Sequence, residues 1–302
     1  MTVCIAAIAQ EYIVTVSDTM ISGITISTDG NCIKQDALCD DWAVMTSGDD
    51  ITHASPIIER ARRYLAETDK TLESAKSCFK RAFQERMVEV ATDRVLSRFG
   101  LDMPTFQRNG KKIFDANTFV TLFNDIRIVN LGSLQFLVCG FDDSGKPHLF
   151  TVYEPGEDAV FDKPGFCAIG SGGLASDSIL YYFNQSPKKT LEETIFNVFA
   201  AKFMAERAGV GRDTTWLVRK RGCGSFTWKG VTLVELIAIM RSEWEREGSP
   251  RVPPDAIKMI KELDIRCHPR FTPAIQPDPQ LTRADPLPPL PSPGSPATSD
   301  ES

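Results

Sequence analysis

The stretch MTVCIAAIAQEYIVTVSD, residues 1–18, contains two hydrophobic runs separated by two polar residues. Residues 3–8 are continuously apolar, Gln10 and Glu11 interrupt the run, and residues 12–16 are rich in β-branched side chains. Two such runs joined by a short polar link are typical of a β-hairpin. We therefore predict that the chain opens with a hairpin.

Further strand and helix signals follow in groups. Hairpins are predicted for residues 32–38 with 42–46, and for residues 134–141 with 148–153 around the turn DDSGK. Apolar residues at helical spacing and end signals predict helices at about 50–66, 72–99, 175–184, 191–208, 231–245 and 254–263. Strands are expected at 166–169, 215–219 and 225–228, and a loop at 100–112. Residues 119–126 form a short apolar segment that fits either a helix or a strand. Strand groups separated by helix pairs predict an α+β fold, a four-layer αββα sandwich with helices on both outer faces.

The composition is that of a globular protein without a membrane or nucleic-acid partner. The 302 residues are 42% hydrophobic and 25% charged, with a net charge of −6. An acidic chain has no general attraction to nucleic-acid backbones or anionic membranes, and no apolar run is long enough to span a bilayer. Met1 precedes a strand-like stretch rather than a basic signal region, so we expect a cytoplasmic location.

Eight cysteines and three histidines are scattered without the paired spacing of zinc ligands. We therefore expect no metal site, no cofactor and mostly buried, reduced thiols.

The last part of the chain differs in composition from the rest. Ten of the 19 prolines lie in residues 268–302, which include PLPPLP at 286–291. Such a segment cannot bury enough apolar surface to fold, so we predict a disordered tail with polyproline II bias. A role as a ligand of an SH3-like domain is the alternative.

The dipeptide Met1-Thr2 indicates where catalysis could occur. Initiator methionine is generally removed before a small residue, which would leave Thr2 with a free α-amine beside its hydroxyl. A hydroxyl is a weak nucleophile that needs a base. An α-amine has a reference pKa of about 7.7–8.0 and can accept a proton near neutrality. A terminal threonine can thus supply both nucleophile and base, although threonine is also an ordinary second residue.

Three residues follow Thr2 at defined distances: Asp18 is 16 positions later, Lys34 is 32 later and Gly48 is 46 later. In this spacing the sequence resembles the β-type proteasome subunits and the bacterial HslV peptidase, which are N-terminal nucleophile (Ntn) hydrolases. The segments GFDDSGKPHL at 140–149 and GSG at 170–172 also resemble motifs of that family. The resemblance covers about residues 2–230 with an insertion at about 95–130. It implies a domain at 2–265 that carries extra C-terminal helices at about 231–263.

The resemblance implies a role for each motif residue. Thr2 would attack a carbonyl carbon, and the Gly48 N–H would point at the oxyanion that forms. The Lys34 cation would favour the deprotonated hydroxyl and amine, and Asp18 would hold Lys34 in position. Ser171 would support the terminal amine. Taken singly, each of these residues also has an ordinary structural reading as a turn, strand or loop residue.

One departure from the family pattern leaves the activity open. The family carries an Asp and a Ser three positions apart before a later strand. Here Asp213 can take the place of the acid, but Trp216 stands where the serine is expected, and Thr214 or Thr215 would have to substitute. The hypotheses are therefore a threonine-type peptidase or amidohydrolase, or a catalytically inactive ring or scaffold subunit of the same fold. A loose dinucleotide-binding pattern, GSGGLA at 170–175, is a third hypothesis without preceding βαβ units.

The resemblance also implies where a peptide or protein substrate would lie. It would extend between residues 20–23 and 47–49, and the expected substrate-binding residues are Ile21, Ser22, Cys32, Asp36, Thr46 and Asp50. Two carboxylates without a counter-cation in that set favour a basic or polar substrate side chain. Alternatively, Asp36 and Asp50 face solvent or cap the helix that begins near Asp50. The other implied partner is a homo-oligomeric ring of this chain, and an unfoldase or regulatory partner stays unspecified.

Overall fold

A computed structural model of the full chain describes all residues except 23–26, 30–33, 223–224, 227–230, 247–251 and 263–302. The elements below belong to one unit, Met1–Arg270. The predicted tail at 268–302 and the predicted domain end at 265 lie outside the described residues. None of the described helices has the length and apolar character needed to cross a bilayer.

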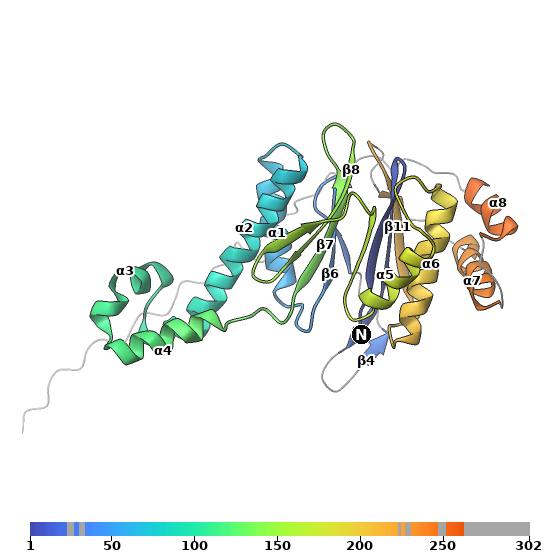
Figure 1. The fold of residues 1–302 in the computed structure, drawn as a ribbon. Coiled ribbons are helices and arrows are strands. Elements are labelled where there is room, and N and C mark those ends of the chain that lie inside the picture. Colours follow the sequence, from blue (N-terminus) through green and yellow to red (C-terminus); the bar gives the residue numbers. More distant parts are fainter. Residues whose placement is uncertain (23–26, 30–33, 223–224, 227–230, 247–251, 263–302) are drawn as a thin grey trace, which may run out of the picture. The chain divides into compact units, whose positions relative to one another are not determined.

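The predicted N-terminal hairpin lies within a five-stranded antiparallel sheet of order β10-β1-β2-β11-β12 (Figure 1). Its strands are β1 (Cys4–Ala9), β2 (Tyr12–Asp18), β10 (Phe166–Ile169), β11 (Thr214–Lys220) and β12 (Ser225–Phe226). The hairpin register runs from Cys4↔Ser17 to Ala9↔Tyr12, so Gln10 and Glu11 form the turn. Every residue of β1 is buried, because both faces of this strand are covered.

The second sheet is also antiparallel and has the order β5-β6-β7-β8-β9. Its strands are β5 (Gln35–Ala37), β6 (Trp42–Ser47), β7 (Gln135–Phe141), β8 (Pro147–Tyr153) and β9 (Glu157–Val160). The predicted hairpins are present, although β5 is shorter than expected and residues 32–33 lie outside the described residues. A separate two-stranded ribbon, β3 (Met20–Ser22) with β4 (Ser27–Asp29), was not predicted, and neither was β9.

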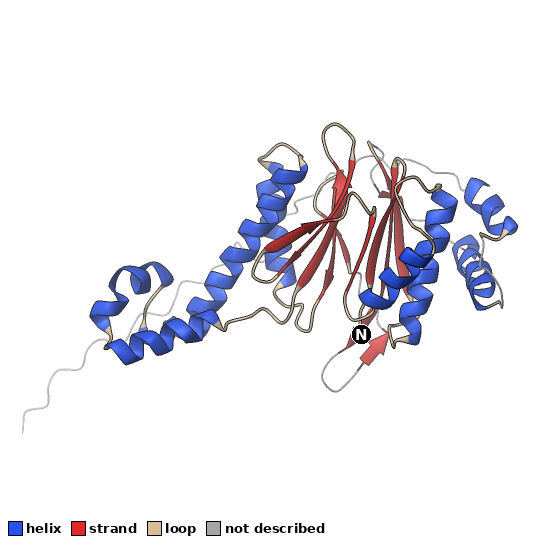
Figure 2. Ribbon diagram, viewed as in Figure 1, coloured by secondary structure: helices blue, strands red, loops and turns tan. Residues whose placement is uncertain are grey.

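The two sheets pack face to face, with helices on their outer faces (Figure 2). Between the sheets, alternate β1 residues such as Ala6 and Ile8 pack with Met45 and Leu137. The intervening β1 residues, such as Ile5, pack against helices α5 (Gly173–Tyr182) and α6 (Leu191–Arg207). Helices α1 (Ala54–Ala66) and α2 (Leu72–Ala91) cover the second sheet. The mixed α+β class is confirmed, and this layering fits the predicted αββα sandwich.

Local signals explain most helix boundaries. Thr190 and Glu193 form the predicted capping box at the start of α6. Helix α2 ends earlier than predicted and continues as a π-helical turn at Thr92–Leu96 and a 3-10 turn at Ser97–Phe99. The closing helices α7 (Val231–Glu245) and α8 (Pro254–Glu262) are present, as predicted.

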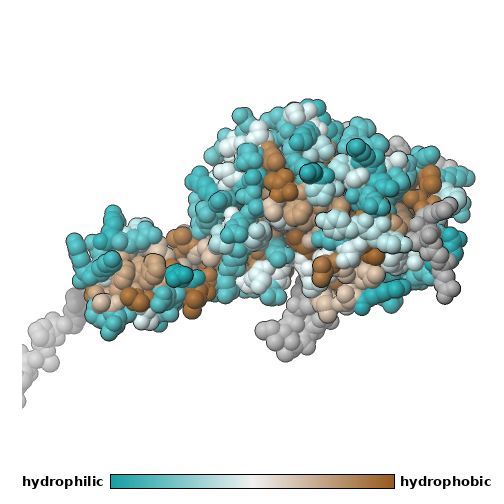
Figure 3. Space-filling model, viewed as in Figure 1, coloured by the Kyte–Doolittle hydropathy of each residue, from teal (hydrophilic) through white to brown (hydrophobic). Residues whose placement is uncertain are grey.

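The predicted loop at residues 100–112 is wrong. Helices α3 (Met103–Ile113) and α4 (Ala116–Arg127) occupy this region, with their own small core. Each begins at an aspartate cap: Asp102 accepts from the Thr105 N–H at 2.7 Å, and Asp115 accepts from two N–H groups. Pro104 lies in the first turn, where proline is tolerated, so it does not interrupt α3. Figure 3 shows hydrophobic surface over this part of the chain, and Ile113, Val120, Phe123 and Ile128 are its exposed apolar residues.

Candidate functional site

The hairpin register brings the start of the chain beside the end of β2. The last β1–β2 pair is Cys4↔Ser17, so Thr2 and Val3 lie next to Asp18. The Val3 N–H donates to Asp18 Oδ1 at 2.8 Å, and the Asp18 N–H donates to the Val3 carbonyl at 3.3 Å. Two backbone-anchored contacts therefore hold the segment that carries Thr2.

Lys34 joins Thr2 to Asp18. Its Nζ donates to Thr2 Oγ1 at 2.8 Å and to both Asp18 carboxylate oxygens at 2.9 Å. The Asp18 side chain is fully buried, and that of Lys34 is 7% exposed. The Met20 N–H donates to Asp18 Oδ2 at 3.0 Å. All these neighbours of the Asp18 carboxylate are donors, which is the arrangement that a buried negative charge requires.

The turn between β10 and α5 contacts Thr2 from the other side. The Thr2 N–H donates to Ser171 Oγ at 3.0 Å, and the Thr2 carbonyl accepts from the Gly172 N–H at 3.1 Å. Gly170 has φ +88°, and a Cβ there would lie 2.5 Å from the Thr2 carbonyl oxygen. This position therefore needs glycine for both its backbone conformation and its close approach to Thr2.

Gly48 follows β6 directly, and Ser47 is the last residue of that strand. A Cβ on Gly48 would lie 3.1 Å from Leu134 Cα, so the β6 end packs tightly against the chain that leads into β7. The buried Ser47 Oγ has no hydrogen-bond partner among the described residues. Ser47 Cβ lies 3.4 Å from a Cβ placed on Gly170, so β6 ends beside the Thr2 site. The role of Gly48 toward an oxyanion stays a prediction.

Among the described residues, no hydrogen bond or ion pair joins Asp213 to Thr2, Asp18 or Lys34, although the next residue, Thr214, pairs with Asp18. Asp213 is exposed, and no hydrogen bond or ion pair joins it to any other residue that the structure describes. Trp216 is buried and lies edge-on to Phe199, with ring centroids 5.3 Å apart. A core-filling role thus explains why an indole, rather than a hydroxyl, stands at this position.

The expected pocket residues are only partly described. Cys32 lies outside the described residues, and Ile21 and Ser22 are described only as backbone of β3. Thr46 is adjacent to the site because its N–H donates to the Lys34 carbonyl at 3.1 Å. Within the described part of the chain, no hydrogen bond or ion pair links Asp36 or Asp50 to Thr2, Asp18 or Lys34.

The two pocket carboxylates have different surroundings. Asp36 is an exposed residue of β5; partial desolvation raises the pKa of its carboxyl, while the Arg62 cation nearby opposes this rise. Hydrogen bonds from Thr52 lower the pKa of Asp50, which accepts from the Thr52 N–H at 2.9 Å in the turn before α1. Arg62 is thus a counter-cation that the sequence argument did not include. Asp50 binds Thr52 in the turn before α1 and does not cap that helix, whose N-cap is His53.

Neither the dinucleotide-binding hypothesis nor a metal site gains support. Strand β10 and its partner β1 are antiparallel, whereas dinucleotide-binding loops follow parallel strands. The loop at Gly170 and Gly172 is occupied by contacts to Thr2 and Val210. Among the described residues, no group of three or more His, Cys, Asp or Glu side chains is arranged to hold a metal ion.

Two contacts of the site were not anticipated from the sequence. The Val3 and Gly172 N–H groups anchor Asp18 and the Thr2 carbonyl, respectively. The only sequence signal for them was position, since both residues adjoin the motif residues Thr2 and Ser171.

No protein-family model and no curated protein sequence matches this chain. Among solved structures, the fold is similar to that of eukaryotic HslV from Trypanosoma brucei, with a TM-score of 0.47 and 15% sequence identity. The similarity covers 72% of this chain and 99% of that chain. At this level it is a likeness in fold, and the assignment of residue roles rests on the contacts around Thr2.

Proposed function

We propose that this chain, once Met1 is removed, is a threonine-type hydrolase of peptide or related amide bonds. One observation carries the proposal: Lys34 Nζ lies 2.8 Å from Thr2 Oγ1 while it is bound to both oxygens of the buried Asp18 carboxylate. A cation held at the hydroxyl of the second residue has a clear chemical use, because it stabilises the negative charge that develops on that oxygen during attack.

The proposed reaction has two stages. Removal of Met1 converts the Thr2 nitrogen, now an amide that donates to Ser171 Oγ, into a free α-amine. The amine takes the hydroxyl proton as Thr2 Oγ1 attacks the substrate carbonyl carbon, and the carbonyl electron pair moves to the oxygen, toward the Gly48 N–H. Collapse breaks the amide bond, and the leaving amine takes the proton from the Thr2 ammonium. Water then hydrolyses the ester on Thr2.

A catalytically inactive subunit of the same fold is the second candidate. Two observations favour it: Asp213 is exposed without a partner among the described residues, and Trp216 fills the place where the family pattern has a serine. An inactive protein of this kind would keep the buried Lys34–Asp18 pair for its fold and would lack nucleophilic reactivity at Thr2.

The deciding experiment combines intact mass with an electrophilic peptide probe. We expect a native mass without Met1 and a single covalent adduct that maps to Thr2. Thr2→Ala should lose the adduct, whereas Thr2→Ser, which keeps a hydroxyl, should retain it. Retention of Met1 in the native protein would exclude the terminal-amine mechanism. A processed protein that forms no adduct would favour the inactive subunit.

We also propose a homo-oligomeric ring in the cytoplasm, with no unfoldase or regulatory partner assigned. Light scattering at micromolar concentration tests the assembly, and a monomeric mass would count against it. The substrate class is a peptide or protein, and its preferred side chain is addressed by a prediction below.

A further inference from the structure

A fully buried lysine lies behind the Thr2 site, on helix α6. The Lys202 side chain is 0% exposed, and its Nζ donates to Glu206 Oε1 at 2.8 Å and to the Gly211 carbonyl at 2.5 Å. Lysine is almost never fully buried unless it is paired, and burying an ammonium is costly. The Gly211 contact is the unusual one, because it connects the buried charge to the backbone of a loop.

That loop lies beside the residues that flank Thr2 and Ser171. A Cβ on Gly209 would lie 2.8 Å from Met1 Cε, so the loop touches the residue that precedes Thr2. A Cβ on Gly172 would lie 2.7 Å from the Val210 side chain and 3.1 Å from that of Val3, so the loop also packs behind the Ser171 turn. Past Gly211 the chain enters β11, where Thr214 pairs with Asp18.

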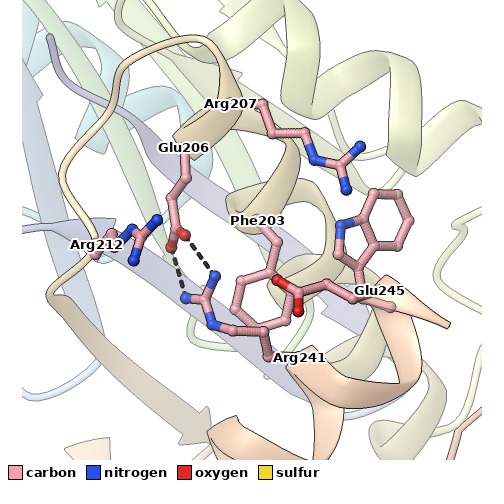
Figure 4. A pocket seen from close by; sticks show the side chains of 7 residues that line it. Phe203, Glu206, Arg207, Arg212, Arg241 and Glu245 are labelled. Atoms are coloured by element: carbon pink, nitrogen blue, oxygen red, sulfur yellow. Dashed lines mark hydrogen bonds and ion pairs between the residues drawn. The ribbon is translucent and has the colours of Figure 1, made fainter.

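The buried lysine is linked to a closing helix through a second ion pair. Arg241 of α7 donates to both oxygens of Glu206 at 2.6 and 3.0 Å, and the Glu206 side chain is 7% exposed (Figure 4). Such a two-bond pair fixes the orientation of the carboxylate. The chain of contacts therefore runs from α7 through Glu206 and Lys202 to the Gly211 carbonyl.

The electrostatics place the ammonium near the active-site charges. Burial lowers the pKa of Lys202, whereas Glu206 and then Asp18 oppose that lowering. Asp18 is the residue that binds Lys34, so the same carboxylate interacts electrostatically with both lysines.

We infer that Lys202 is a positioning residue for the Thr2 site, which holds the loop at residues 209–211 against the Ser171 turn and Val3, the residue after Thr2. This inference rests on the proposed function. Stability alone is a weak explanation for the pair, because buried ion pairs can be replaced by apolar residues with little loss of stability. An apolar side chain could fill the same space but could not bind the Gly211 carbonyl.

The test uses the rate of covalent adduct formation at Thr2 on the full chain. In Lys202→Met, an unbranched side chain of similar length replaces lysine, and Gly211 loses its donor. We expect the maximal inactivation rate to fall about 10- to 100-fold, the range for loss of a hydrogen bond to a charged group. The half-saturating probe concentration should change less than about threefold, because Lys202 does not touch substrate. The matched control is Lys189→Met, which breaks the partly exposed Lys189–Glu193 pair near the start of α6 and should leave the rate unchanged.

A double variant separates positioning from folding. Lys202→Met with Glu206→Met leaves no buried charge unpaired, because Arg241 is 29% exposed and can be hydrated. We expect the double variant to be more thermally stable than Lys202→Met but to form the adduct as slowly as that single variant. The inference would be overturned if the double variant recovered both stability and the parental rate of adduct formation, or if Lys202→Met kept the parental rate. Either result would leave the proposed function standing. If the parent protein, with Met1 removed, forms no adduct, the proposed function and this inference both fail.

Discussion

The replacement Asp18→Asn tests the buried ion pair most directly. The Asp18 oxygens are surrounded by donors: the Val3 and Met20 N–H groups and the Lys34 ammonium. An asparagine there would place its own NH₂ against one of these donors and leave the Lys34 charge, 7% exposed, without its partner. Removing one partner of a buried pair costs about 3–5 kcal/mol. In a domain of this size each kcal/mol corresponds to about 2–4 °C, so we expect the melting temperature to fall by about 6–20 °C.

The assay is thermal unfolding followed by circular dichroism, combined with adduct formation at Thr2 below the transition. The matched control is Asp125→Asn, since Asp125 forms an exposed, long pair with Arg98 at 3.9 Å and should shift the melting temperature very little. We expect Asp18→Asn also to slow adduct formation, because Lys34 would no longer be held 2.8 Å from Thr2 Oγ1. A fall of less than about 2 °C with an unchanged adduct rate would refute the reasoning.

Four further predictions address the turn, the pH dependence and the pocket. Gly170→Ala should abolish adduct formation, because its Cβ would meet the Thr2 carbonyl. The control Gly100→Ala also lies at a positive φ, +65°, but in open space, so it should only lower stability. Burial raises the pKa of Asp177 to about 6, so the stability linked to its neutral form is lost as pH rises from about 4 through 6. Asp177→Asn should therefore raise the free energy of urea unfolding at pH 7.5, by about 1 kcal/mol after allowance for solvent screening, and change it little at pH 4, and equal effects at both pH values would contradict this. Burial lowers the pKa of His148, but hydrogen bonds with Asp162 and Asp142 outweigh it and raise the pKa overall. The stabilisation from His148 is then complete below about pH 6.5 and lost as pH rises through its folded pKa, so His148→Asn should flatten the pH dependence of urea unfolding in that range. A fluorogenic panel that varies the residue before the cleaved bond should show no preference for basic side chains that depends on Asp36, because Arg62 lies near that exposed carboxylate and Asp50 is held by Thr52; a basic preference that Asp36→Asn removes would restore the idea of a basic-selective pocket, and neither result bears on the Thr2 mechanism.

Local sequence patterns predicted an element correctly where neighbouring residues alone determine it. The polar pair at Gln10 and Glu11 breaks two apolar runs, and the β1–β2 turn forms there. The capping box at Thr190 was recognised because both partners are three residues apart. The helices α3 and α4 are not evident from the sequence because the Gly, Pro and Asn of residues 100–112 are typical of a loop, and because the two helices pack in a small separate core.

The candidate site was also predicted only in part. The resemblance to the Ntn hydrolases singled out Thr2, Asp18 and Lys34 by their spacing, and in the structure Lys34 is hydrogen-bonded to both Thr2 and Asp18. The family pattern suggested Asp213 as a supporting acid, and the structure has an exposed side chain there with no hydrogen-bond or ion-pair partner among the described residues. Spacing along the chain can report a hairpin register over a few residues, but it cannot report the direction of a loop side chain.

The sequence by itself determined the mixed α+β class and the opening hairpin. Both depend on periodicity or on short separations, which local hydrogen bonding and burial impose directly. The site residues were indicated by the resemblance to a known family, and the structure brings Thr2, Asp18, Lys34 and Ser171 together. Only the tertiary structure decided that Lys202 is buried and that Arg62 lies near Asp36. It also decided that the Gly170 backbone lies close to the Thr2 carbonyl. Those contacts join residues from distant elements, and their strength comes from the low dielectric and close packing that exist only after the layers have assembled.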